Sequence, residues 1–195
     1  GAGLNNRHAV YIGKDAGKGN KGYRNVGIGY LSMSTAGSGS ENNTAIGTLS
    51  MEKLTTGDFN TAVGNGALRK VTTGSSNVAL GMGATQNLTT GSFNISIGRG
   101  ALYDNVGGDR NLAIGYLAGE NNASGAGNIF MGFSAGQNEA GSDKLYIENS
   151  NSTTPLVYGE FDNDWIKVNG NLSASAGFTD DDNNTKIQVE EAANE

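Results

Sequence analysis

The chain contains no cysteine, one proline and one histidine among its 195 residues. Without cysteine it can form no disulfide and no thiolate metal site, and it has no thiol nucleophile. The single histidine, His8, excludes any site that needs two imidazole groups. No apolar run approaches the roughly 20 residues that a membrane-spanning helix needs. We therefore expect no direct membrane insertion and little of the usual catalytic repertoire.

Positive charge is also scarce, because 13 Lys and Arg face 19 Asp and Glu for a net charge of −6. Nucleic-acid binding needs a basic face, and these cations are scattered, so no nucleic-acid partner is expected. What is abundant is glycine (32) and asparagine (25). Glycine is costly to order, so this composition argues against an ordinary globular enzyme. Regular apolar clusters argue equally against a disordered tail.

A phrase of the form Asn-x-Ala-Ile-Gly returns along the chain with a period of about 17 residues. Seven copies open at Asn25, Asn43, Asn60, Asn77, Asn94, Asn111 and Asn128. A degenerate first copy ends at Gly13. The period is too short for a helical hairpin, and it predicts a solenoid.

Each copy predicts a short strand followed by turn residues such as Thr55-Thr56-Gly57. Side chains alternate along a strand, so the large penultimate residue and the small residue before it face opposite ways. We expect the large residues to stack into the structural core; they are Ile12, Ile28, Ile46, Val63, Leu80, Ile97, Ile114 and Met131. The small-residue face, with Ala45 and Ala62, is expected to meet another chain. The predicted fold is all-β, a parallel β-roll of about eight coils, each one period long, with two short strands per coil.

The asparagine that opens each copy is expected to stack into a ladder or to cap the turn. One large apolar residue per coil is too little burial to order so much glycine, which predicts an obligatory oligomer with cyclic symmetry. After Gly141 three further strands are expected, at 144–149, 156–161 and 165–168. The predicted organisation is a β-roll domain over 1–141, a β-hairpin cap or neck over 142–171, and the start of another β segment over 172–195.

The repeated Asn-x-Ala-Ile-Gly-x-x-Ala pattern, over residues 8–141, resembles the head repeats of trimeric autotransporter adhesins. Its longer copies, such as residues 60–76, resemble β-roll arrays of phage and phage-like tail fibres and of large secreted surface proteins of marine bacteria. The resemblance implies a left-handed β-roll, a homotrimer, an extracellular location and a cap that precedes a C-terminal intramolecular chaperone. The expected function is a non-enzymatic fibre segment that acts as stalk and attachment module for a cell-surface glycan or protein receptor. The alternative is the head of a bacterial cell-surface adhesin that binds glycan or matrix.

Aromatic residues are the candidates for surface recognition, because aromatic faces beside amides and carboxylates hold sugars. They are Tyr30, Tyr103, Tyr116, Phe133, Tyr158 and Trp165. Packing between coils or chains is the alternative role for the four in the roll. Receptor contacts are expected from the variable loops, such as 51–59, 86–93 and 103–110, or from the cap around 158–165, because loops on a rigid scaffold are free to vary.

Other interpretations of single motifs are weaker. Asp162, Asp164 and Asp180–Asp182 could bind calcium, but no twelve-residue calcium loop is present and acidic turns are common. Glu160 with Asp162 or Asp164 could form a glycosidase pair, which spacing alone does not show. The glycines of residues 13–22 lack the Gly-Lys-Ser/Thr ending of a phosphate loop. The threonine columns do not form a continuous ice-binding array, since they are broken in the loops. We expect no catalytic, cofactor-binding or metal-binding residues.

Overall fold

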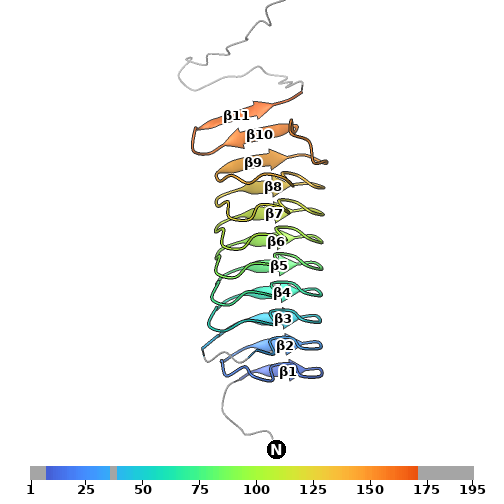
Figure 1. Cartoon of the computed structure of the whole chain (residues 1–195), viewed down its shortest axis with the longest axis vertical. Helices are drawn as coiled ribbons and strands as arrows, with labels where there is room; N and C mark the ends of the chain where they lie inside the picture. Colours follow the sequence, from blue (N-terminus) through green and yellow to red (C-terminus); the bar gives the residue numbers. More distant parts are fainter. Residues whose placement is uncertain (1–7, 36–38, 171–195) are drawn as a thin grey trace, which may run out of the picture.

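The computed structural model describes residues 8–35 and 39–170, which form one tall stack of strands (Figure 1). Eleven strands of this part of the chain pair in chain order into a single sheet. Pairing is parallel from β1 to β9 and antiparallel from β9 to β11. The chain is therefore an all-β parallel solenoid of about eight coils of ~17 residues with a small antiparallel part at its C-terminal end. No helix of these described residues is long and apolar enough to cross a membrane.

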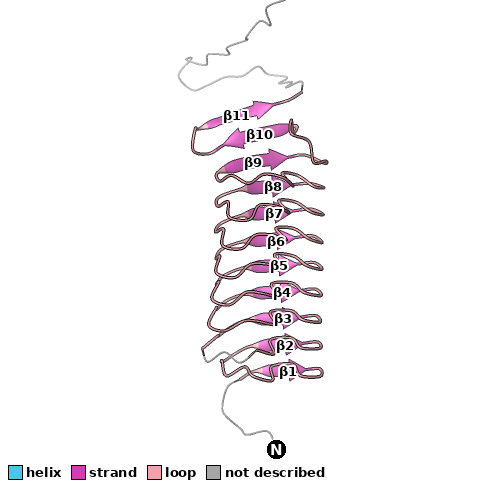
Figure 2. Ribbon diagram, viewed as in Figure 1, coloured by secondary structure: helices cyan, strands magenta, loops and turns pink. Residues whose placement is uncertain are grey.

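The strands of the solenoid are three residues long and, from the second coil on, begin one residue after each repeat asparagine. They are β1 (Val10–Ile12), β2 (Val26–Ile28), β3 (Thr44–Ile46), β4 (Thr61–Val63), β5 (Val78–Leu80), β6 (Ile95–Ile97), β7 (Leu112–Ile114) and β8 (Ile129–Met131). The expectation of two strands per coil is wrong, because turns make up the rest of each described coil (Figure 2). Residues in these turns, such as Leu49 and Met51, have φ angles of 60° and 48°, which an extended strand does not allow.

Each strand ends at a glycine that the backbone requires. Gly64 has a φ of 139°, and a Cβ atom there would overlap the carbonyl oxygen of Gly81 in the next coil. The same close approach recurs from Gly13 to Gly132 at every closing glycine. A side chain at this position would therefore push two coils apart.

The interior lies on the opposite face of the strands from the one predicted. The central strand residues, Ala45, Ala62, Ala79, Ser96, Ala113 and Phe130, are fully buried. The eight residues expected as core point outward: Ile12, Ile46, Val63, Ile97, Ile114 and Met131 are 36–58% exposed in the single chain, and Ile28 and Leu80 are half-buried. The small-residue face is thus the inside of the coil and not a surface for another chain.

The reason for this inversion is the narrow space inside each coil. Large apolar side chains enter it from the turn segment, at Met33, Met51, Leu54, Leu68, Val71, Leu88 and Leu102. They leave room for only a methyl or hydroxymethyl group at the centre of the strand. Phe130 obeys the same volume limit, because glycines stand opposite it at 119 and 136 and a Cβ at either would overlap its ring. Gly17 makes room for Tyr11 in the same way, because a Cβ at Gly17 would overlap the Tyr11 ring.

The repeat asparagines form a buried ladder, as predicted. The Oδ1 atom of Asn43 accepts hydrogen bonds from the backbone N–H of Asn60 (2.8 Å) and from its Nδ2 (3.1 Å). The Nδ2 of Asn60 also donates to the carbonyl of Gly74 at 2.9 Å. The pattern repeats up the stack and ends where the backbone N–H of Lys144 donates to Asn128 Oδ1 at 2.9 Å. The amides of the ladder thus find their partners in neighbouring coils although they are buried.

The C-terminal strands confirm the three predicted after Gly141. They are β9 (Lys144–Ile147), β10 (Val157–Glu160) and β11 (Trp165–Val168). β9 pairs in parallel with β8 in the register Phe130↔Tyr146, so the sheet of the solenoid continues across residue 141. β10 and β11 then close the stack as antiparallel strands (Figure 1). The further β segment predicted over 172–195 lies outside the described residues.

Replacing Asn60 by alanine should lower the free energy of unfolding by about 2–4 kcal/mol. The change leaves the Gly74 carbonyl and the backbone N–H of Asn77 without partners in the interior, while Asn77 Nδ2 retains its bond to the Gly91 carbonyl. Chemical denaturation of the variant against the parent measures the loss. The matched control is Asn65→Ala, which alters an exposed asparagine of the same coil. Equal stability of both variants would contradict a structural role for the ladder.

Replacing Ala62 by leucine should destabilise the fold by about 1–3 kcal/mol, because the buried strand centre has no room for three more carbons. Thr61→Leu is its control, since Thr61 lies on the outer face of the same strand. Thermal unfolding by circular dichroism compares the two variants. The assignment of inside and outside fails if Thr61→Leu destabilises more than Ala62→Leu does.

Candidate functional site

The outer face of the strands carries an apolar stripe, formed by the first and third residues of β1 to β8 and interrupted by Thr44 and Thr61 in its first column. The first residues are Val10, Val26, Thr44, Thr61, Val78, Ile95, Leu112 and Ile129. The third residues are the eight large residues that the sequence had placed in the core. Each column is in register from coil to coil, and neither contains a charged residue. An apolar band of this length is rarely left in water, so the stripe is a candidate interaction surface.

The turn segments place the predicted recognition aromatics on the outside of the coils. Tyr116 and Phe133 stack with ring centroids 5.1 Å apart and planes 14° apart. The guanidinium of Arg99 lies 5.5 Å from the centroid of Tyr116 and completes a three-layer stack. Tyr30 is exposed but lies far down the stack, beside neither of them. Two of the four predicted aromatics of the roll, Tyr116 and Phe133, are thus in contact with each other. Arg99, which was not predicted from the sequence, contacts Tyr116.

Arg99 could have been found from the period alone. It follows the closing glycine of its coil, as Tyr116 and Phe133 follow theirs, so the three stand one repeat apart in a single column. Tyr103, the fourth aromatic, lies in a different column and lines a hollow of about 340 Å³. Its hydroxyl accepts a hydrogen bond from the Nε2 of Gln86 at 2.8 Å.

Two further aromatics stand out by exposure. Phe59 and Phe93 are 62% and 63% exposed, and both have left-handed φ angles, of 59° and 62°. They fall within two of the loops expected to carry receptor contacts, 51–59 and 86–93, but they were not singled out as recognition residues. Each directly precedes a ladder asparagine.

The cap aromatics form a chain of ring contacts from the interior to the surface. Buried Phe130 touches Tyr146 (centroids 5.9 Å), Tyr146 touches Tyr158 (5.1 Å), and Tyr158 touches Trp165 (5.5 Å). Trp165 is 42% exposed at the far end, and Tyr158 is half-buried. Both predicted cap residues therefore belong to one aromatic cluster, which closes the top of the solenoid core.

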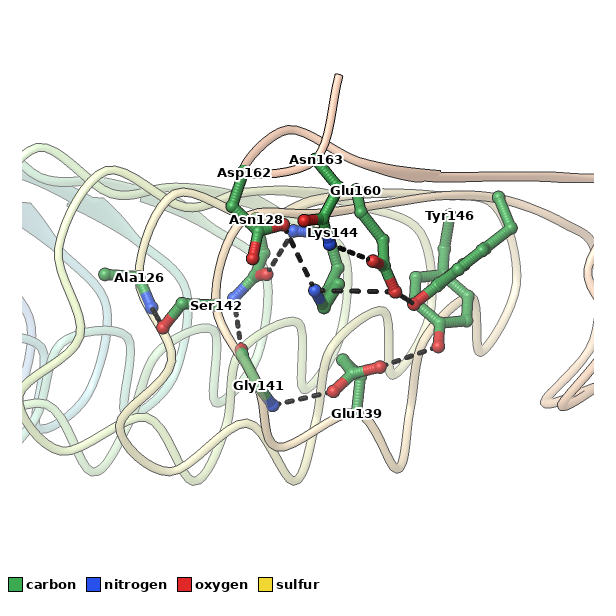
Figure 3. Close-up of polar contacts among 11 residues, drawn as sticks. Ala126, Asn128, Glu139, Gly141, Ser142, Lys144, Tyr146, Glu160, Asp162 and Asn163 are labelled. Carbon is green, nitrogen blue, oxygen red and sulfur yellow. Dashed lines mark hydrogen bonds and ion pairs between the residues drawn. The ribbon is translucent and has the colours of Figure 1, made fainter. Parts of the chain in front are cut away.

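Acidic groups and Lys144 lie beside this cluster (Figure 3). Lys144 Nζ lies 3.7 Å from Glu160 Oε1 and 3.4 Å from Asp162 Oδ1. The hydroxyl of Tyr146 donates to Glu139 Oε2 at 2.7 Å, and that of Tyr158 donates to Glu160 Oε1 at 2.8 Å. Of the carboxylates weighed as a glycosidase pair, Glu160 is thus engaged by a lysine and a tyrosine and Asp162 by the same lysine, in a network that ties β10 to β9.

The network shifts the pKa values of its members. Burial, reinforced by the hydrogen bond to Glu160, raises the pKa of Tyr158 to about 12. Burial and the bond to Glu139 raise the pKa of Tyr146 well above its ordinary value. Hydrogen bonds from Tyr158 and then Asn163 lower the pKa of Glu160. Each shift favours the protonated tyrosine and the ionised carboxylate, which are the two states that form these hydrogen bonds in the structure.

Within the described ranges, no group of three or more His, Cys, Asp and Glu residues could hold a metal ion. Asp180–Asp182, weighed as calcium ligands, lie outside those ranges. His8 lies at the N-terminal end, where it lines a hollow with Tyr23, Arg24 and Glu41.

Alkaline pH should loosen the cap. Because the folded state raises the pKa of Tyr158, the protonated hydroxyl of Tyr158 contributes fully to the stability of the fold below pH 10. This contribution is lost as the pH rises through about 12. The tyrosinate absorbance of the parent should therefore show a late titration that Tyr158→Phe diminishes. Glu160→Gln should move it to lower pH, because it removes the acceptor charge. Tyr30→Phe, which alters an exposed ring far from the cap, should leave the late titration unchanged; a loss there would contradict the assignment.

No family model, curated protein or solved structure matches this chain. The β-solenoid assignment accordingly stands on the 17-residue period and on the parallel register from β1 to β9.

Proposed function

We propose that this chain is a segment of a non-enzymatic, tail-fibre-like homotrimer, and that it serves outside the cell as a stalk and attachment module. The observation that carries the proposal is the apolar stripe along the outer strand face. It runs the full height of the coils without a charged residue. A second candidate, the head of a bacterial cell-surface adhesin for glycan or matrix, has the same supporting observation.

The length of the stripe favours association along the axis. Strands of neighbouring coils lie ~4.8 Å apart, so eight coils give a band roughly 40 Å long. Its two columns are two residues apart along each strand, which makes the band narrow and flat. An apolar band of this shape is best covered by the same band of another chain, because every coil then meets its equivalent at the same height.

The resemblance of the repeat to trimeric adhesin heads and tail fibres favours three chains and a left-handed coil. Burial of the stripe replaces the contact through small residues expected from the sequence. It also supplies the apolar burial that the thin interior of one chain lacks. Each coil gives the trimer three copies of any surface site, so weak single contacts sum to firm attachment.

The fibre and the adhesin head differ in the domain that comes after the segment in the native reading frame. A membrane-anchoring β-barrel after residue 195 identifies the adhesin, and a phage-type chaperone domain identifies the fibre. Sequencing of that frame therefore separates the two candidates.

Ile97→Asp should abolish or strongly weaken self-association, because it sets three charges against one another in the apolar band. Light scattering during size-exclusion chromatography should give a trimer for the parent and a smaller species for the variant. Thr90→Asp adds the same charge at an exposed turn of the neighbouring coil and should stay trimeric. The milder Ile97→Thr should raise the concentration needed for assembly. A folded 20 kDa monomer of the parent at micromolar concentration would overturn the proposal.

A further inference from the structure

One column of turn residues changes its character in the middle of the solenoid. Two residues after the closing glycine stands leucine at 31, 49 and 117, but glycine at 66, 83 and 100. Leu31, Leu49 and Leu117 have φ angles of 52–60°, close to the 65–67° of the three glycines. The backbone of this chain therefore accepts leucine in this conformation, and conformational freedom alone does not account for the glycines.

Gly83 and Gly100 of this column line a furrow that crosses successive coils. It encloses about 340 Å³, and its lining includes Met82, Gly83, Gly100, Tyr103 and Leu117. A Cβ at Gly83 would come within 3.2 Å of the Tyr103 ring, so the absence of a side chain lets that ring lie close against the backbone. The volume is at the lower end of the range for small-ligand sites.

The polar walls of the furrow are held in place by neighbouring coils. Gln86 Nε2 donates to the Tyr103 hydroxyl at 2.8 Å, and Gln137 Nε2 donates to Glu120 Oε2 at 2.6 Å. Arg99 stacks over Tyr116 and lies 3.4 Å from its hydroxyl. Long side chains that are already ordered lose less entropy when they bind a ligand.

The chemistry of the lining selects a class of ligand. Arg99 and Glu120 give one cation and one anion, and Arg99 makes no ion pair with any described residue. Asn65 and Gln86 add amides, while Met82, Tyr103 and Leu117 add apolar surface. An anionic ligand would meet Glu120 with like charge, and a purely apolar one would leave both charges unpaired. A neutral ring with hydroxyl groups on its edge and an apolar face satisfies all of these groups.

We infer that the furrow of coils 4 to 7 is a binding subsite for a neutral pyranose of a surface glycan. The inference rests on the proposed attachment function and names its ligand class and position. The lining residues belong to the turns that follow β4 to β7, and none belongs to the apolar stripe. Assembly through the stripe therefore leaves three furrows, one per chain, for multivalent contact.

The test is saturation-transfer NMR and calorimetry on the full chain in its native oligomeric state. The probes are methyl glycosides of glucose, galactose, mannose and N-acetylglucosamine, and their disaccharides. Glucuronate and N-acetylneuraminate are the acidic comparators. At least one neutral probe should bind, more tightly than either acid, with saturation transferred from the protein to the ring protons of the sugar.

Three variants should each weaken this binding by about tenfold or more. Gly83→Leu fills the furrow with a residue that other coils carry at the same position; Arg99→Ala and Glu120→Gln remove its charged groups. Lys70→Ala is the matched control, because it removes an exposed cation outside the furrow lining and should bind as the parent does.

The inference is overturned if no neutral probe binds, or if binding is unchanged in Gly83→Leu and in Arg99→Ala. Preference for the acidic probes would also overturn it. Light scattering on the same samples separates this failure from that of the proposed function. A trimer without sugar binding rejects the furrow alone, whereas sugar binding by a monomer supports the furrow and rejects the fibre.

Discussion

The structure depends on hydrogen bonding between coils at a fixed offset of one repeat. This bonding continues outside the strands: in the turns, the N–H of Leu68 donates to the carbonyl of Ala84 at 3.1 Å, and that of Thr72 to Thr89 at 2.9 Å. Because the backbone of each coil is matched to the next along its whole path, equivalent residues must stack directly above one another. Repetition in the sequence therefore places equivalent residues in columns along the stack.

The columns divide into an inside that is filled and an outside that is free to vary. Inside, a small strand centre faces a large turn residue, and Phe130 is accommodated only because glycines stand opposite it. Outside, one column changes from Arg99 to Tyr116 to Phe133 over three coils without disturbing the backbone. A rigid interior with variable outer columns suits a scaffold that presents surface contacts.

The sequence alone predicted the period, the strands, the asparagine ladder and the three strands after Gly141. It failed on which face is inside. Strand alternation separates Ile46 from Ala45, but it does not say which of the two faces inward. The usual rule that large apolar residues are buried failed here because turn residues such as Leu54 and Leu68 already fill the narrow coil. The candidate sites were predictable only where the period governs them: it brings Tyr116 to Phe133, whereas the antiparallel return of β10 brings Glu160 to Lys144.

The asparagine ladder also has a direction. Each Oδ1 accepts its bonds from the coil that comes next in the chain, as Asn43 does from Asn60 and Asn60 does from Asn77. A finished coil therefore displays open acceptors on its C-terminal side, and a newly synthesised coil arrives with the donors that fit them. The two ends of a partly folded solenoid are therefore chemically different, and the C-terminal end carries the open Oδ1 acceptors that the next coil along the chain can occupy.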